Sequence, residues 1–130
     1  MGNSYRELQV WRLSMQLTKD VYAVTKNFPS DERFGLISQL RRAAVSIPSN
    51  IAEGQARYSQ REFLRFLSNA RGSLAEVETQ LLLSTELGYV PESEMQKLTR
   101  KTAEVGRLLN GLYSAIQLRT ENPELGTASR

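Results

Sequence analysis

Three arginines recur at steps of four residues near the middle of this 130-residue chain, with a tyrosine among them. Arg57, Arg61 and Arg65 are expected on one face and at one end of a helical protein, because residues four apart are neighbours on a helix. A guanidinium offers paired donors to a phosphate, and the ring of Tyr58 could stack on a base. The pattern predicts a candidate nucleic-acid-binding site. The alternative is a solvated basic face with a tyrosine that packs on the end of the protein.

A second group is a polar stripe on an otherwise apolar helical segment. Its members stand at steps of three or four residues: Arg42, Ser46, Asn50 and Glu53. Such a stripe could bind a ligand or RNA, but it is also typical of a structural hydrogen-bond network that accommodates a helical proline, here Pro48. Arg71 is expected at the level of Arg42 in an antiparallel helix pair. We interpret the stripe and Arg71 as structural. Arg42 and Arg71 are both expected to form ion pairs with carboxylates such as Glu53, Glu76 or Glu104.

The chain has no histidine and no cysteine, which limits its chemistry. This excludes disulfides, thiolate nucleophiles, imidazole bases and every metal site that depends on Cys or His ligands. Carboxylate pairs such as Glu76/Glu78 stand two residues apart, so a helix places them on different faces. We therefore expect no catalytic residue, no metal site, no cofactor and no small-molecule substrate. The sequence predicts a protein that is not an enzyme.

The net charge of +3 is unevenly distributed. Residues 33–75 carry seven arginines against two glutamates, whereas residues 76–130 carry six basic and eight acidic side chains. A basic middle made only of arginine indicates a polyanionic partner such as RNA. The alternative is that these arginines serve subunit contacts or an acidic protein partner. No apolar run approaches the ~20 residues that span a bilayer, so we expect a soluble cytoplasmic protein without a membrane partner.

Apolar residues at three- and four-residue steps predict four helices, over about residues 5–28, 31–53, 59–87 and 91–119. Short links between long helices make neighbouring helices antiparallel, and no alternating pattern predicts a strand. The sequence therefore predicts an all-α protein, an up-down-up-down antiparallel four-helix bundle. Residues 1–119 would form this single domain, and residues 120–130 a flexible tail.

Local signals mark the ends of these helices. Ser30 or Asp31 is expected to cap the second helix. Ser59 and Glu62 form a capping box, in which each side chain accepts from a free backbone N–H at the start of the third. Pro48 lies deep inside the second segment, where a proline removes a backbone hydrogen bond and costs about 3 kcal/mol. A compensating interaction is therefore expected.

The first two predicted helices carry more apolar surface than one small bundle needs. The first has two adjacent apolar rows, which include Trp11 and Met15, and the second is apolar around most of its circumference. We expect Trp11 and Met15 in the core or at an interface. Large exposed apolar patches are rare on monomers, so the pattern predicts association of several copies.

The segment Arg41-Arg-Ala-Ala-Val-Ser-Ile-Pro-Ser-Asn-Ile-Ala-Glu-Gly54 is distinctive, as is the segment 62–81 that begins Glu-Phe-Leu-Arg-Phe-Leu-Ser-Asn-Ala-Arg. Together they resemble the four-helix bundle proteins encoded by intervening sequences of bacterial 23S ribosomal RNA genes. Tyr5-Arg-Glu-Leu-Gln-Val-Trp11 and Gly106-Arg-Leu-Leu-Asn-Gly-Leu112 resemble the start and end of that family. The likeness covers nearly the whole chain.

The resemblance implies a cytoplasmic bundle without enzyme activity that assembles as a homopentamer. It also implies a relation to the accessory variability determinant proteins of diversity-generating retroelements, which are basic pentamers that work with a reverse transcriptase and RNA. We therefore expect an RNA-associated accessory or scaffold protein, whose partners are its own copies and RNA or an RNA-handling protein. The alternative is a protein-interaction scaffold that binds no nucleic acid.

Overall fold

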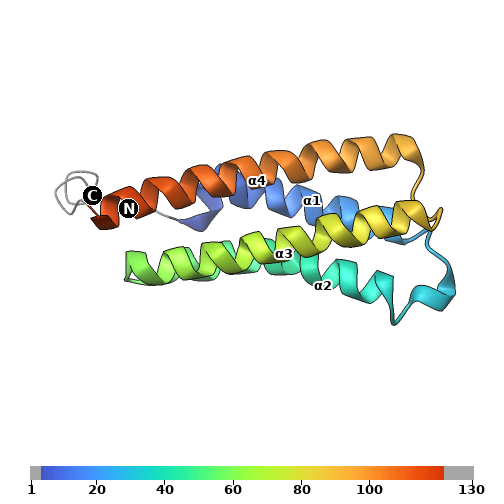
Figure 1. Ribbon diagram of the computed structural model, residues 1–130. Coiled ribbons are helices and arrows are strands. Elements are labelled where there is room, and N and C mark those ends of the chain that lie inside the picture. The colour runs from blue at the N-terminus through green and yellow to red at the C-terminus, as the bar shows by residue number, and fades with distance from the viewer. Residues whose placement is uncertain (1–3, 122–130) are drawn as a thin grey trace.

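The structure is a computed structural model and describes residues 4–121; residues 122–130 of the predicted tail lie outside the described part. The described residues form two short 3-10 helices and four α-helices, without a strand. These elements are η1 (Tyr5–Glu7), α1 (Gln9–Thr25), η2 (Ser30–Glu32), α2 (Leu36–Ala56), α3 (Gln60–Glu86) and α4 (Glu92–Glu121). The four α-helices lie side by side, with consecutive helices antiparallel (Figure 1). The predicted all-α, four-helix class is confirmed.

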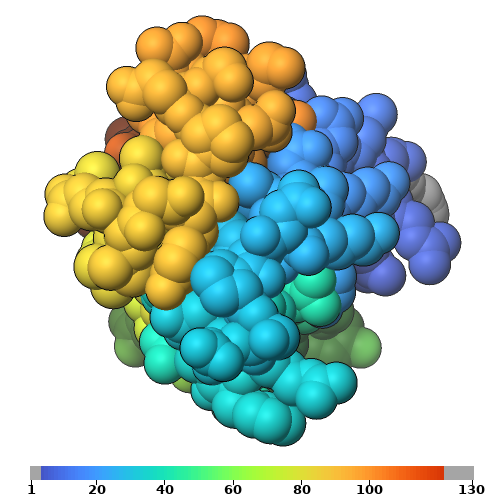
Figure 2. Space-filling view, turned by 90° about the vertical axis from the view of Figure 1, so that its right-hand side faces the viewer, coloured from blue at the N-terminus to red at the C-terminus, as the bar shows by residue number. Residues whose placement is uncertain are grey.

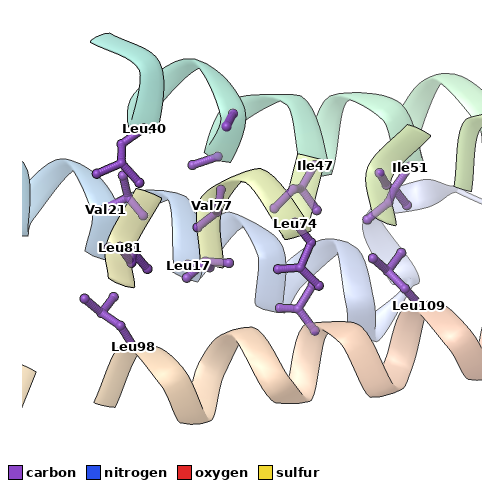
Figure 3. Close-up of a cluster of buried hydrophobic side chains, with 14 of the residues drawn as sticks. Leu17, Val21, Leu40, Ile47, Ile51, Leu74, Val77, Leu81, Leu98 and Leu109 are labelled. Atoms are coloured by element: carbon purple, nitrogen blue, oxygen red, sulfur yellow. The ribbon is translucent and has the colours of Figure 1, made fainter. Parts of the chain in front are cut away.

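Each helix packs against two neighbours, in the closed order α1, α2, α3, α4. The core runs along the axis of the bundle and receives leucine, isoleucine and valine side chains from every helix (Figure 3). Among the buried members are Leu17 and Val21 of α1, Leu40 and Ile47 of α2, Val77 and Leu81 of α3, and Leu98 and Leu109 of α4. Burial of these faces stabilises helices whose outer surfaces then present polar groups at fixed positions.

The contact between α2 and α3 is the most extensive in the bundle. Gly54 lies where the two helices are close together. A Cβ atom added there would lie 2.7 Å from Cβ of Phe66 and 2.9 Å from Cδ1 of Phe63. Real Cβ atoms do not come so close, so only glycine allows this approach. The turn between α2 and α3 is therefore built on a tightly packed pair of helices.

Pro48 is buried inside α2 and lacks the N–H that would bind the carbonyl of Ala44. The hydroxyl of Thr18 in α1 donates to this carbonyl, with an O–O distance of 3.1 Å, while it also lies 2.8 Å from the carbonyl of Ser14. The neighbouring helix thus satisfies the acceptor that the proline leaves free. The polar stripe of α2 does not provide this compensation, contrary to the sequence-based interpretation.

The first two helices begin later than predicted. Leu8 has an extended backbone (φ −74°, ψ 126°), which separates η1 from α1. α2 starts at Leu36 rather than near Asp31, and neither Ser30 nor Asp31 caps it. The carboxylate of Glu32 reaches forward instead, and its Oε1 accepts from the N–H of Leu36 at 3.1 Å. The acidic residues after Pro29 form the short helix η2.

Most of the apolar surface of α1 and α2 is covered within one chain. Trp11 and Met15 are half-buried, and Trp11 packs against the core. Among the large apolar side chains of these two helices, only Tyr22 (40%) and Val45 (41%) are substantially exposed. Other large apolar side chains are more exposed: Phe34, Tyr58, Leu82, Leu83, Leu87 and Leu118. The end of the bundle where the α1–α2 and α3–α4 links meet faces the viewer in Figure 2. Association of several copies stays a prediction.

Candidate nucleic-acid interface

The link between α2 and α3 holds the side chains that the sequence pattern singled out. We refer to Arg57, Tyr58, Arg61 and Arg65 as the turn cluster. Arg57 ends α2 with an extended backbone (φ −77°, ψ 153°), and Tyr58 follows with its side chain completely exposed (102%). Oγ of Ser59 accepts from the N–H of Glu62 at 3.2 Å, so the predicted serine cap is confirmed. Arg61 and Arg65 then project from the first turns of α3.

Two of these arginines share an aromatic platform. The Cζ atoms of Arg57 and Arg65 lie 4.8 Å and 4.5 Å from the centroid of the Phe66 ring. A guanidinium at this distance from an aromatic ring is attracted to it electrostatically. The sequence pattern did not indicate Phe66, because a phenylalanine at helical core spacing is expected only to fill the core. Its buried ring brings Arg57 and Arg65 together.

Carboxylates already bind two of the three arginines. Nη2 of Arg57 lies 2.7 Å from Oε2 of Glu53, and Nη2 of Arg65 lies 2.9 Å from Oε1 of Glu62. The hydrogen bond from Arg65 lowers the pKa of Glu62, and the same bond raises the pKa of Arg65. Glu62 therefore binds Arg65 instead of closing the reciprocal capping box. Arg61 is exposed and has no partner in the part of the chain that the structure describes.

The polar stripe of α2 forms a smaller network than predicted. Oγ of Ser46 and Oγ of Ser73 in α3 are 2.7 Å apart. Nδ2 of Asn50 donates to the carbonyl and hydroxyl oxygens of Ser46 at 2.8 Å and 2.9 Å. This trio fixes the position of α2 against α3. Ser73 lies at a core-facing position of α3, and only the pairing of the two helices shows its role.

The prediction that Arg42 and Arg71 bind carboxylates is wrong. Neither arginine forms an ion pair within residues 4–121: Arg42 is exposed without a partner, and Cζ of Arg71 lies 5.1 Å from the centroid of the Tyr113 ring. The proposed carboxylates bind nearer arginines, Glu53 with Arg57 and Glu104 with Arg107. Residues three or four apart meet on their own helix, so these local pairs form instead of pairs across the bundle.

A groove of about 400 Å³ between α1 and α2 holds two more arginines. It is lined by Tyr22, Ser38, Arg41, Arg42 and Val45, so no carboxylate lines it. The residue pattern placed Arg42 in the structural network and indicated no role for Arg41. The signal available in the sequence is the Arg41-Arg42 pair itself, although a pair alone does not show which arginine lacks a carboxylate.

The sequence matches the family model described as "23S rRNA-intervening sequence protein" over residues 6–111, from η1 into α4. The chain belongs to this family. The resemblance identified from the sequence is thus confirmed. No match is found among curated proteins.

A solved structure shares the fold of this family member. It is the crystal structure of a protein with unknown function from the S23 ribosomal protein family of Bacteroides thetaiotaomicron. The two chains are 22% identical and superpose with a TM-score of 0.72, over 80% of this chain and 97% of that chain. The similarity shows a common arrangement of helices.

Two observations concern other kinds of site. Among the described residues, no helix is both long and apolar enough to cross a membrane. The same residues contain no group of three or more His, Cys, Asp or Glu side chains that could hold a metal ion. The arginine-bearing surfaces are therefore the features of residues 4–121 that we develop as candidate binding sites.

Proposed function

We propose that this member of the 23S rRNA-intervening sequence family is an RNA-associated accessory or scaffold protein of the cytoplasm. It acts without catalysis and as a homo-oligomer, a homopentamer by its family resemblance. The observation that carries the proposal is the turn cluster, where a completely exposed tyrosine stands beside three arginines at one end of a rigid bundle. Copies of this cluster in a ring would bind one RNA at several points and gain avidity.

The chemistry of the cluster suits single-stranded or looped RNA. Stacking of a base on an aromatic side chain contributes about 1–3 kcal/mol, and the exposed ring of Tyr58 is free to accept one. Arg61 is available for a phosphate at once. The ion pairs of Arg57 and Arg65 are exposed, and exposed pairs contribute little to stability. A phosphate can therefore replace Glu53 or Glu62 at small cost.

The state of the carboxylates supports a role other than catalysis. Hydrogen bonds from Arg65 and Arg107 lower the pKa values of Glu62 and Glu104. A general acid requires the opposite shift, toward the working pH. These glutamates are held as anions by arginines, so they are suited to ion pairing rather than to proton transfer.

The test is fluorescence anisotropy of a labelled structured RNA with the purified protein at about 50 and 200 mM salt. Several phosphate contacts would weaken the affinity by orders of magnitude over this range. We expect steep, salt-sensitive binding by the native protein. A variant with Arg57, Arg61 and Arg65 changed to alanine should lose it while light scattering shows an unchanged oligomer mass.

A matched variant controls for the loss of positive charge. Arg33, Lys97 and Arg100 are exposed and form no ion pair among the described residues, so their triple alanine variant removes the same charge elsewhere. We expect it to retain most of the affinity. Absence of RNA binding by the native protein at about 50 mM salt would overturn the proposed function.

A second candidate function is a protein-interaction scaffold that binds no nucleic acid and uses its arginines for subunit contacts or an acidic partner. The observation in its favour is a group of exposed leucines at the end of α3, namely Leu82, Leu83 and the C-cap residue Leu87. Exposed apolar groups of this kind mark protein interfaces. The same experiment separates the two functions, because in this case the triple arginine variant would change the oligomer mass and the native protein would not bind RNA.

A further inference from the structure

The groove between α1 and α2 gathers arginines without any carboxylate among its lining residues. We propose that this groove is a phosphate-binding site, in which Arg41, Arg42 and Ser38 bind a phosphate of an RNA backbone. The inference rests on the proposed RNA association, and it places backbone contact on the side of the bundle, apart from the turn cluster. Three features support this site: the guanidinium of Arg41 is ordered, free donors stand beside it, and the surrounding charge is positive.

Contacts with Thr25 and Tyr22 of α1 hold the guanidinium of Arg41 in place. Its Nε donates to Oγ1 of Thr25 at 2.9 Å, its Nη2 lies 3.4 Å from the carbonyl of Tyr22, and its Cζ lies 4.5 Å from the centroid of the Tyr22 ring. Thr25 is only 1% exposed and itself donates to the carbonyl of Val21 at 2.7 Å. A guanidinium has five N–H donors, so several stay available to a ligand. A donor that is already ordered loses little entropy when it binds.

Free donors stand beside this guanidinium. Arg42 is exposed, and within the described chain neither its guanidinium nor the hydroxyl of Ser38 has a partner. The two residues are four apart on α2, so they lie on the same face of the helix. Guanidinium and hydroxyl donors are the groups that most often hold a nucleic-acid phosphate. The groove therefore offers two guanidinium groups and a hydroxyl to one anion.

The charge around the groove is positive. Lys19 stands one helical turn before Tyr22 and Lys26 one turn after it, and both lysines are exposed and unpaired among residues 4–121. The acid closest to them on α1 is engaged elsewhere, since Asp20 accepts from Nζ of Lys101 in α4 at 2.6 Å. Two arginines thus line the groove without a carboxylate, and two lysines stand near Tyr22 along the chain. A surface with this excess of positive charge attracts anions.

A second groove provides the contrast. It measures about 520 Å³ between α3 and α4, and its lining includes Arg71 and Arg107. Glu78 lines the same groove, and Arg107 is bound to Glu104. A phosphate there would face one free carboxylate and displace another. The larger groove is therefore the poorer anion site, although it contains as many arginines.

The test compares two variants that each remove one exposed guanidinium without an ion pair in the described part of the chain. Arg42→Gln changes the groove, and Arg100→Gln makes the same change on α4. With a labelled single-stranded RNA at about 50 mM salt, we expect Arg42→Gln to weaken binding about tenfold and to reduce the salt slope by about 0.7 for each phosphate lost. Arg100→Gln should change the affinity by less than about twofold, and Arg42→Lys should keep most of the salt slope, because lysine retains the charge.

Equal effects of Arg42→Gln and Arg100→Gln would overturn the groove site. The proposed function would survive that result, provided that the triple alanine variant of the turn cluster still loses RNA binding. If the native protein binds no RNA at all, the proposed function fails and the groove is tested by itself with a second probe.

The second probe is inorganic phosphate, compared with chloride at the same ionic strength. Nε–H of Arg41 is hydrogen-bonded, so its NMR signal reports on the groove together with the amide signal of Ser38. Shifts that appear in the native protein and not in Arg42→Gln would show that the site takes a free phosphate rather than a backbone phosphate. If neither RNA nor phosphate acts through Arg42, the inference is wrong.

Discussion

The turn cluster and the α1–α2 groove both place guanidinium groups against an aromatic ring, but their surroundings differ. At the turn, Arg57 and Arg65 lie against Phe66 and each binds a carboxylate. In the groove, Arg41 lies against Tyr22 and no carboxylate is in contact. Similar numbers of arginines in the sequence thus leave different amounts of charge free for a ligand. A count of basic residues gives the number of arginines, but it does not show how much of their charge is free to bind a ligand.

The two sites also differ in what orders the guanidinium. Exposed ion pairs hold Arg57 and Arg65, and such pairs exchange readily with solvent and salt. A buried threonine hydroxyl holds Arg41, and this bond does not compete with an anionic ligand. We therefore expect the turn cluster to adapt to different ligands, whereas the groove presents one fixed geometry.

The largest expected effect concerns the packing under the turn cluster. Gly54→Ala would place a Cβ 2.7 Å from Cβ of Phe66, and overpacking of this kind costs about 1–3 kcal/mol. Gly72→Ala is the matched control in α3, because a Cβ there meets nothing within 4 Å. Alanine should stabilise that position by about 0.5–1 kcal/mol. Urea unfolding followed by circular dichroism measures both values, and equal stability of the two variants would contradict the close packing of α2 and α3.

A smaller effect concerns the support of the groove. Thr25→Val keeps the shape of a buried side chain but removes the acceptor for Nε of Arg41. We expect a loss of about 1–2 kcal/mol in the free energy of unfolding, because a hydrogen bond to a charged group contributes more to stability than one between neutral groups. Thr79→Val, at an exposed site where the hydroxyl bonds only within α3, should change stability by less than about 0.5 kcal/mol. A weaker RNA affinity for Thr25→Val alone would link the support to the binding site.

The smallest expected effect tests the difference in carboxylates directly. The double variant Glu53→Gln, Glu62→Gln removes the anions that bind Arg57 and Arg65. Because both guanidinium groups become available to phosphates, RNA affinity should rise about threefold at about 50 mM salt, with a steeper salt dependence. Anisotropy measures the change. An unchanged affinity would show that these carboxylates do not limit RNA binding at the turn cluster, which would contradict the difference drawn between the two sites.

Much of the fold follows from the sequence, and the misses have local causes. Helical periodicity indicated all four helices because burial of an apolar stripe repeats every three to four residues. The start of α2 was misplaced because Glu32, rather than Ser30 or Asp31, supplies the acceptor for its first turn. Several side chains within a few residues can accept from the first N–H groups of a helix, and the residue types alone do not show which of them does so.

The candidate site was less predictable than the fold. The spacing of Arg57, Arg61 and Arg65 indicated the turn cluster, but not that Phe66 orders two of its members. Arg42 was assigned to a structural network because it shares a helix face with Ser46 and Asn50. Whether an arginine is paired or free depends on which of several nearby carboxylates it meets, and the arginine ion pairs of the described residues all join residues three or four apart on one helix. The residue types alone do not show which candidate partner each arginine takes.

The sequence by itself determined the helical class, the family and the absence of histidine and cysteine chemistry, because these depend on composition, local periodicity and a distinctive segment. Only the tertiary structure decided which polar groups meet. Thr18 satisfies the carbonyl that Pro48 leaves free, Thr25 orders Arg41, and Arg42 finds no ion-pair partner among residues 4–121. Each of these outcomes depends on the register between two helices. That register is set by the packing of the whole core and not by any short stretch of the chain.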